Sequence, residues 1–192
     1  MADPVAPLDL VHRSHLPPLA GGQLAPAVVM VHGWGGDEKV MAIFERLVPP
    51  AAAIISPRAP LDMHDGGFNW YQPVDDEPAQ LKGLESLRAF VAGLPGPYRI
   101  DPNRMVLVGF SQGAAMSAAL LLSDPPLVLA VASLAGFLPS AAQRWVQPGR
   151  AAGRSVFMAH GSADTTVPIA RAQAARDALQ TAGAQVAYHE YE

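Results

Sequence analysis

The stretch Met105-Val106-Leu107-Val108-Gly109-Phe110-Ser111-Gln112-Gly113 decides the fold of this chain. Its first four residues form a short apolar run, as in a strand buried on both faces of a sheet. A Gly-x-Ser-x-Gly pentapeptide follows, and the small residues of 114–119 favour a helix packed close to that sheet. A strand, a sharp turn and a helix in this order form a nucleophile elbow, which presents a serine at the strand end. The stretch therefore points to Ser111 as a candidate nucleophile.

The two glycines of the pentapeptide have a steric role in this interpretation. The turn is so tight that side chains at Gly109 and Gly113 would collide with the neighbouring strand and helix. The pentapeptide by itself is a weak signal, because such a motif also arises by chance in a chain with 17 glycines. The alternative is a glycine-rich turn whose serine takes no part in chemistry.

Apolar runs and helical patterns alternate along the rest of the chain. Helical patterns cover 40–48, 81–94 and 168–181, and 57–78 is expected to be a long ordered loop. This alternation predicts an open α/β sheet, mostly parallel, with right-handed crossovers. The expected strands are 27–31, 52–56, 105–109, 128–133, 155–159 and 185–189.

Composition narrows the class of protein. At 192 residues the chain fits one domain, and no apolar run is long enough to cross a membrane. A net charge of -4 without a basic stripe argues against nucleic acid as a partner. The N-terminus lacks the features of a secretory signal, so a cytoplasmic location is expected. With no cysteine, covalent chemistry is left to hydroxyls, amines or carboxylates.

A second glycine-rich turn, His32-Gly33-Trp34-Gly35-Gly36, follows the first strong strand. Acyl transfer needs donors for an oxyanion, and the backbone N–H groups of Trp34 and Gln112 are the candidates. His32 precedes the turn and is expected to brace it rather than act as a base. A phosphate-binding turn is the alternative, but neither a Gly-Lys-Ser/Thr sequence nor a three-glycine dinucleotide fingerprint is present.

Asp164 is the candidate acid. It lies in a polar turn between the strand at 155–159 and the helix that starts at Pro168. Taken alone, an Asp before a helix most often caps the helix or forms a turn. Its place in the chain favours a catalytic role, because α/β-hydrolases carry their triad in the order serine, acid, histidine.

The whole chain resembles the phospholipase/carboxylesterase family of α/β-hydrolases, which includes acyl-protein thioesterases. Besides the elbow and the two turns, the matching segments are 57–60, 66–71, 100–104, 134–139 and 160–168. The resemblance implies an α/β-hydrolase fold with a mostly parallel central sheet, helices on both faces and no large lid domain. It implies Ser111 as nucleophile, Asp164 as acid and the N–H groups of Trp34 and Gln112 as oxyanion hole. Trp70 and Phe137 would line the substrate pocket, with a place in the core as the alternative.

The chain departs from the family pattern at the third triad member. The family's catalytic histidine lies on the loop after the last strand, and this sequence reaches Glu192 within or at the end of that strand. His189 is the one histidine that follows Asp164, and a strand residue points sideways rather than over the sheet edge. We therefore expect a single domain over 1–192 that lacks the C-terminal loop and helix, with the histidine expected just after Glu192, or a catalytically impaired chain.

The expected activity is that of a serine carboxylesterase that cleaves short-chain or aryl esters through an acyl-enzyme, with no metal and no cofactor. Its partner would be a small-molecule ester. Acyl-protein thioesterase or lysophospholipase activity uses the same residues and is the first alternative. A non-catalytic binding protein for small ligands, favoured by the missing histidine, is the second. A metal enzyme built on His12 and His15 is the weakest, because residues three apart on a strand face opposite sides.

Overall fold

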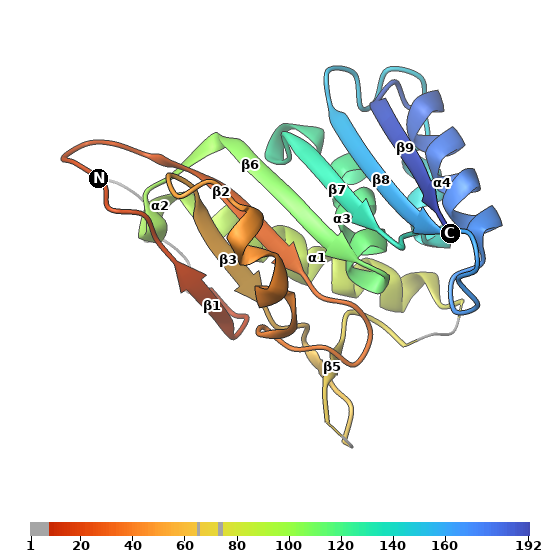
Figure 1. Ribbon diagram of the computed structural model, residues 1–192, viewed down its shortest axis with the longest axis horizontal. Helices are drawn as coiled ribbons and strands as arrows, with labels where there is room; N and C mark the ends of the chain where they lie inside the picture. Colours follow the sequence, from red (N-terminus) through yellow and green to blue (C-terminus); the bar gives the residue numbers. More distant parts are fainter. Residues whose placement is uncertain (1–7, 65, 73–74) are drawn as a thin grey trace.

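A seven-stranded sheet runs through the molecule in the order β1-β3-β2-β6-β7-β8-β9 (Figure 1). The computed structural model describes residues 8–64, 66–72 and 75–192. β1 pairs antiparallel with β3, and the other pairings of this sheet are parallel. The strands are β1 (His12–His15), β2 (Ala25–Val31), β3 (Ala53–Pro57), β6 (Ile100–Phe110), β7 (Ala130–Leu134), β8 (Ser155–Gly161) and β9 (Gln185–Tyr191).

The expected apolar runs coincide with the parallel strands, to within two residues at most ends. The largest difference is β6, which begins at Ile100 instead of 105 because residues 101–104, polar except for Pro102, extend the strand ahead of the apolar run. Residues 101–104 lie between the pairs Ala25–Ile100 and Ala27–Met105, where the register of β2 and β6 shifts, and a search for buried apolar runs does not detect such an irregular stretch.

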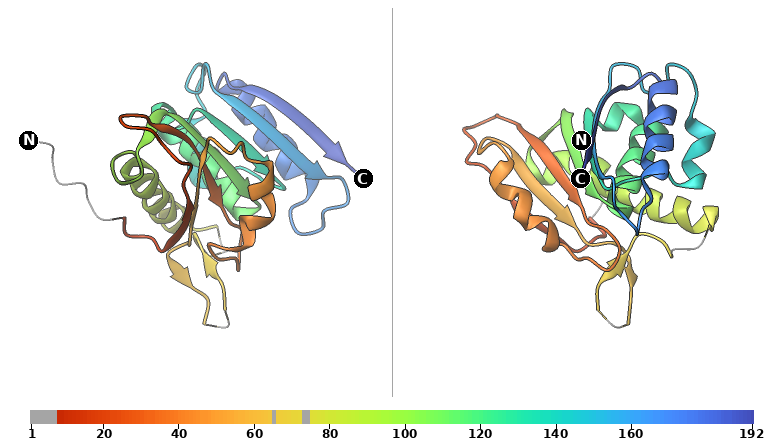
Figure 2. Two further views of the ribbon diagram at one scale, coloured as in Figure 1. Left: turned by 60° about the vertical axis from the view of Figure 1, so that its left-hand side comes forward. Right: turned by 45° about the vertical axis from the view of Figure 1, so that its right-hand side comes forward.

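Helices cover both faces of the sheet, as the family resemblance implies (Figure 2). Strand register places Leu107, Val131 and Val156 in one row, and all three are buried on the face covered by the α-helices. The 3-10 helix η1 (Val40–Leu47) lies on the other face, where Met41 packs against Met30 of β2. The α-helices are α1 (Glu77–Gly93), α2 (Pro95–Tyr98), α3 (Gln112–Ser123) and α4 (Ile169–Thr181).

The segment predicted as one long loop over 57–78 is more structured than expected. Its middle forms a small hairpin of β4 (Leu61–Asp62) and β5 (Phe68–Asn69). Two-residue strands are too short to produce a hydrophobic period. Two further 3-10 helices, η2 (Pro125–Leu127) and η3 (Ser140–Trp145), were likewise not predicted. Within the described ranges, no helix combines the length and the apolar character needed to span a membrane.

The carboxyl ends of β2, β6, β7 and β8 meet at one edge of the sheet (Figure 1). In open α/β sheets this edge is where ligands bind, because the loops that leave the strands there converge. The glycine-rich turn, the pentapeptide and Asp164 all follow strands that end at this edge. The topology therefore gathers the three sequence motifs in one region.

Candidate active site

Ser111 occupies a strained turn between β6 and α3. Its φ of 51° and ψ of -116° lie outside the conformations that residues other than glycine ordinarily adopt. Strain of this kind costs about 1–3 kcal/mol and persists only where surrounding contacts enforce it. One such contact is the hydrogen bond of 2.8 Å that the Ser111 N–H donates to the Leu134 carbonyl. The turn lifts the serine side chain off the sheet edge.

Glycines 109 and 113 make the turn possible, for the steric reason predicted from the sequence. A Cβ at Gly113 would lie 2.1 Å from the Val31 carbonyl oxygen and 2.4 Å from that of His32. A Cβ at Gly109 would lie 2.5 Å from the Gly113 carbonyl oxygen. These obstacles are backbone atoms, which cannot rotate away. Any side chain at either position would force strand and helix apart.

The glycine-rich turn packs directly against the candidate nucleophile. A Cβ at Gly33 would lie 3.3 Å from the Ser111 Cβ, so this glycine allows the turn to approach the serine. Among the described residues, the backbone N–H groups of Trp34 and Gln112 have no hydrogen-bond acceptor. Gln112 is the first residue of α3, whose positive dipole end favours a developing negative charge. Two free donors thus lie beside Ser111.

His32 braces the turn, as expected from its position before it. Its side chain is fully buried; Nδ1 is 2.7 Å from the Gly33 carbonyl oxygen, and Nε2 accepts a hydrogen bond of 2.9 Å from the Ala59 N–H. Burial lowers the pKa of His32, so the neutral ring is the favoured form. With both nitrogens engaged, His32 has no free position from which to accept a proton from Ser111.

The Gln112 side chain has a role that the sequence did not reveal. Its Oε1 accepts a hydrogen bond of 3.0 Å from the Trp70 N–H, and its Nε2 donates one of 2.8 Å to the Tyr71 carbonyl. These two bonds hold the segment after β5 against the elbow. Both partners are backbone groups more than 40 residues earlier in the chain, so no local signal marks this contact.

Asp164 lies in the turn after β8. Its Oδ1 accepts two hydrogen bonds of 2.9 Å from the N–H groups of Thr166 and Val167, and these bonds lower its pKa. Its Oδ2 is 3.8 Å from Nε2 of His160, beyond hydrogen-bond distance. Asp164 therefore forms a turn before α4, which was the alternative to a catalytic role. Its second carboxylate oxygen remains available to accept a hydrogen bond from a further donor.

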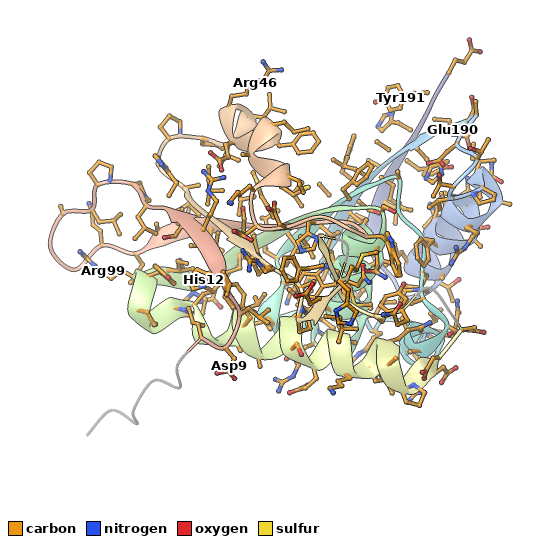
Figure 3. All side chains as sticks on the ribbon, turned by 90° about the horizontal axis from the view of Figure 1, so that it is seen from below. Asp9, His12, Arg46, Arg99, Glu190 and Tyr191 are labelled. Atoms are coloured by element: carbon orange, nitrogen blue, oxygen red, sulfur yellow. The ribbon has the colours of Figure 1, made fainter. Side chains whose placement is uncertain are left out.

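The six histidines all lie within the described residues, and none hydrogen bonds to Ser111. His160 directs its Nε2 to the Val167 carbonyl at 2.7 Å. His189 is exposed, and its ring lies 5.3 Å from that of Phe157 on the strand beside it. His12 lies in β1, the outer strand on one side of the sheet, whereas β9 is the outer strand on the other side (Figure 3).

A cavity of about 800 Å³ opens in front of Ser111. Its walls come from the glycine-rich turn, the elbow, the segment before α1, the loop after β7 and the start of α4. Phe137 lies in the wall, so of the two positions that the sequence left open for it, pocket and core, it takes the one beside the cavity. The lining residues are Trp34, Tyr71, Asp75, Gln80, Ser111, Gln112, Phe137, Leu138, Pro139, Ser140, Gln143, Thr166, Val167 and Arg171.

Trp70, the other residue expected to line a pocket, is not part of this wall. It takes the alternative position, in the core, with only 1% of its surface exposed. Its indole N–H donates a hydrogen bond of 2.9 Å to the His32 carbonyl, which fixes the start of the glycine-rich turn. The next residue, Tyr71, lines the cavity instead. The sequence motif identified the segment that borders the cavity, but it did not show which of the two aromatic rings faces the cavity.

Comparison with known proteins agrees with this architecture. The sequence profile of the Phospholipase/Carboxylesterase family matches residues 20–192. The chain is similar to NocK of Nocardia uniformis subsp. tsuyamanensis, whose name places it among the esterases, with 33% identity over 116 residues. That match covers 60% of this chain and 34% of NocK, so the chain spans about a third of the length of this relative.

Solved structures show the same fold. The Bacillus cereus carboxylesterase is similar with a TM-score of 0.84 and 23% identity, over 96% of this chain and 85% of that one. A carboxylesterase from Mesorhizobium loti is similar with a TM-score of 0.75 and 22% identity, over 86% and 79% of the two chains. The profile match over nearly the whole chain, together with the sheet order and the elbow, establishes that this chain belongs to the phospholipase/carboxylesterase family of α/β-hydrolases.

Proposed function

We propose that this chain is a serine carboxylesterase in which Ser111 attacks the carbonyl carbon of an ester. The strained elbow is the observation that carries the proposal, because backbone strain at non-glycine residues clusters at functional sites and Ser111 also lines a large cavity. The attack would form a tetrahedral oxyanion. The free N–H groups of Trp34 and Gln112 would donate hydrogen bonds to it, and their alignment before the reaction lowers the barrier.

The oxyanion would then collapse to an ester of Ser111 and release the alcohol, and water would cleave this acyl-enzyme. The attack needs a base that removes the proton from Ser111 Oγ and then donates it to the leaving alcohol, and deacylation needs the same group to take a proton from water and return it to Ser111. In this mechanism Asp164 orients a histidine by accepting a hydrogen bond from one ring nitrogen, which leaves the other free for proton transfer. Its remaining carboxylate oxygen suits that role.

The histidine itself is proposed to follow Glu192. The Ser162 N–H donates a hydrogen bond of 2.7 Å to the Tyr191 carbonyl, so the end of β9 lies next to the turn that carries Asp164. A residue a few positions further along would emerge within reach of this carboxylate. Sequencing the gene past the codon for Glu192 tests this step; a continuation without histidine would contradict it.

Short-chain and aryl esters are the proposed substrates. No large lid domain covers the cavity in the described part of the chain, and the motifs follow one another closely. Initial rates for short p-nitrophenyl esters are expected to exceed those for long-chain acyl thioesters and lysophospholipids. The reverse order would favour the acyl-protein thioesterase or lysophospholipase alternative.

A second function, the binding of a small ligand without catalysis, has one observation in its favour. None of the six histidines, all within the described residues, lines the cavity that contains Ser111. Without a base the serine hydroxyl is a weak nucleophile, and loss of a triad member removes several orders of magnitude in rate.

Labelling with a fluorophosphonate probe separates the two functions. An esterase is expected to be labelled at Ser111, and Ser111→Ala is expected to abolish the label. Ser155→Ala, at an exposed position at the start of β8, is the matched control and is expected to keep it. A wild-type chain that takes up no label while binding short esters would favour the binding protein.

A further inference from the structure

Two polar groups in the cavity wall have no partner among the described residues. The hydroxyl of Tyr71 is buried and makes no hydrogen bond, although only 4% of the residue is exposed. The guanidinium of Arg171 has no carboxylate within 4.0 Å in residues 8–64, 66–72 and 75–192. Both residues line the cavity that contains Ser111. Buried polar groups nearly always have partners, so the unpaired Tyr71 hydroxyl in the cavity wall suits a ligand group, whereas the Arg171 side chain is exposed and open to a ligand or to water.

Arg171 is held in place by an aromatic ring rather than by an acid. Its guanidinium carbon lies 3.8 Å from the centre of the Phe137 ring, in the geometry of a cation–π contact. Stacking occupies one face of the planar guanidinium and leaves the N–H groups at its edge free. Those N–H groups suit a carboxylate, which accepts two parallel hydrogen bonds.

Tyr71 and Arg171 lie close enough for the charge of Arg171 to act on the Tyr71 hydroxyl. Burial raises the pKa of Tyr71 to about 12, so its hydroxyl stays protonated and can donate, while the charge of Arg171 acts on it in the opposite direction. The Tyr71 carbonyl also accepts a hydrogen bond of 2.8 Å from Gln112, which places this residue beside the elbow. The backbone of Tyr71 is therefore fixed beside the elbow, and both donors belong to residues that line the cavity of Ser111.

The cavity wall contains one other charged side chain, Asp75. Its carboxylate already accepts a hydrogen bond from the Ser140 hydroxyl, whereas Arg171 is without an acid partner in the described residues. The remaining lining residues are neutral polar or apolar. The wall thus carries one charge of each sign, and the positive one, on Arg171, still has hydrogen-bond donors to offer a ligand.

We propose that the cavity selects esters that carry a free carboxylate, such as half-esters of short dicarboxylic acids, through Arg171 and the Tyr71 hydroxyl. This inference rests on the proposed function for its substrate class, and it extends that function from short esters in general to anionic ones. Phe137 provides the surface that orients the guanidinium, and the ester group at the other end of the molecule would reach Ser111.

Binding of a matched pair of ligands tests the inference without relying on turnover. Monoethyl glutarate and diethyl glutarate differ only in whether one end is a carboxylate. Ligand-observed NMR titrations on full-length Ser111→Ala are expected to show the monoester binding at least tenfold tighter, a ratio worth about 1.4 kcal/mol.

In the same background, Arg171→Gln is expected to abolish this preference, Arg171→Lys to retain part of it and Tyr71→Phe to reduce it several-fold. Arg176→Gln is the control, because Arg176 lies on the same helix and pairs with Asp177 outside the cavity wall. It should leave the preference unchanged. Equal affinity for the two esters, or a preference that survives Arg171→Gln, would overturn the inference.

The stability of Tyr71→Phe gives a second measurement. Removing an unpaired buried hydroxyl should leave the free energy of unfolding unchanged or raise it, whereas loss of an internal hydrogen bond would lower it. The experiments also distinguish failure of the esterase proposal from failure of this inference. Absence of fluorophosphonate labelling together with a clear monoester preference would reject catalysis and keep the anion site.

Discussion

The carboxylate of Glu38 accepts two hydrogen bonds from Arg58, with Nε 2.6 Å from Oε2 and Nη2 2.9 Å from Oε1. Glu38 follows the glycine-rich turn and Arg58 follows β3, so the pair joins the two segments on either side of the His32 ring. Glu38 is 5% exposed, and the Arg58 guanidinium lies 4.4 Å from the centre of the Phe68 ring. An ion pair outside the cavity wall therefore links the segment after the glycine-rich turn to the segment after β3.

Glu38→Gln is expected to lower the free energy of unfolding at neutral pH by about 2 kcal/mol, because the buried side chain loses its charge-assisted hydrogen bonds. Urea unfolding measures the change. Glu85→Gln, which removes an exposed pair with Arg88, is the control and should cost several-fold less. Equal losses in the two variants would contradict the role given to Glu38.

The Glu38–Arg58 pair also predicts that the free energy of unfolding falls in acid. Hydrogen bonds from Arg58 lower the pKa of Glu38 from 4.5 to about 2. Since the folded pKa is the lower one, the unfolded chain binds this proton first as the pH falls. The stabilisation is complete above the unfolded pKa and disappears as the pH falls from 4.5 towards 2. The difference in unfolding free energy between wild type and Glu38→Gln should shrink over that range. A constant difference would contradict this prediction.

His32 predicts a second pH effect at milder acidity. Burial lowers its pKa below 6.5, and its bond from the Ala59 N–H requires an unprotonated Nε2. The unfolded chain therefore binds the proton first, and this contribution to stability is lost as the pH falls below 6.5. NMR titration of the ring, assigned by comparison with His32→Asn, is expected to give a midpoint below 6.5. A midpoint above that value would refute the bracing role.

Gly113→Ala is expected to prevent folding or to lower the free energy of unfolding by more than about 3 kcal/mol, because backbone atoms occupy the space for its Cβ. The nearest is the Val31 carbonyl oxygen, at 2.1 Å. Gly21→Ala is the matched control, since no atom lies within 4 Å of a Cβ there. Thermal unfolding compares the two. Normal stability in Gly113→Ala would mean that the elbow is looser than described.

Gln112→Met tests the contact that sequence analysis missed. It leaves the Trp70 N–H and the Tyr71 carbonyl without partners in a buried place, and a loss of about 2 kcal/mol in unfolding free energy is expected. The rate of fluorophosphonate labelling should fall about tenfold, because the turn beside Ser111 loses its support. Gln143→Met, at an exposed position of the same wall, should change neither quantity. A fully active and stable Gln112→Met would show that the side chain is dispensable.

Much of this architecture was predictable because its signals are local. A buried parallel strand is a short apolar run, and α4 lies between Pro168 and Gly183 as its boundary residues predict. The steric role of Gly109 and Gly113 follows from the tightness of a turn between adjacent elements. The small hairpin over 61–69 was not predictable, since two-residue strands leave no period.

The sequence by itself determined the order of strands and helices, the position of the elbow and the identity of Ser111 as its central residue, because these depend on neighbours a few positions apart. The tertiary structure alone decided that Gln112 supports the segment at 70–71, that Tyr71 rather than Trp70 faces the cavity, and that Arg171 lies over Phe137. Each of these contacts joins groups that are distant in the chain. Their geometry exists only after the strand ends have been brought to one edge of the sheet.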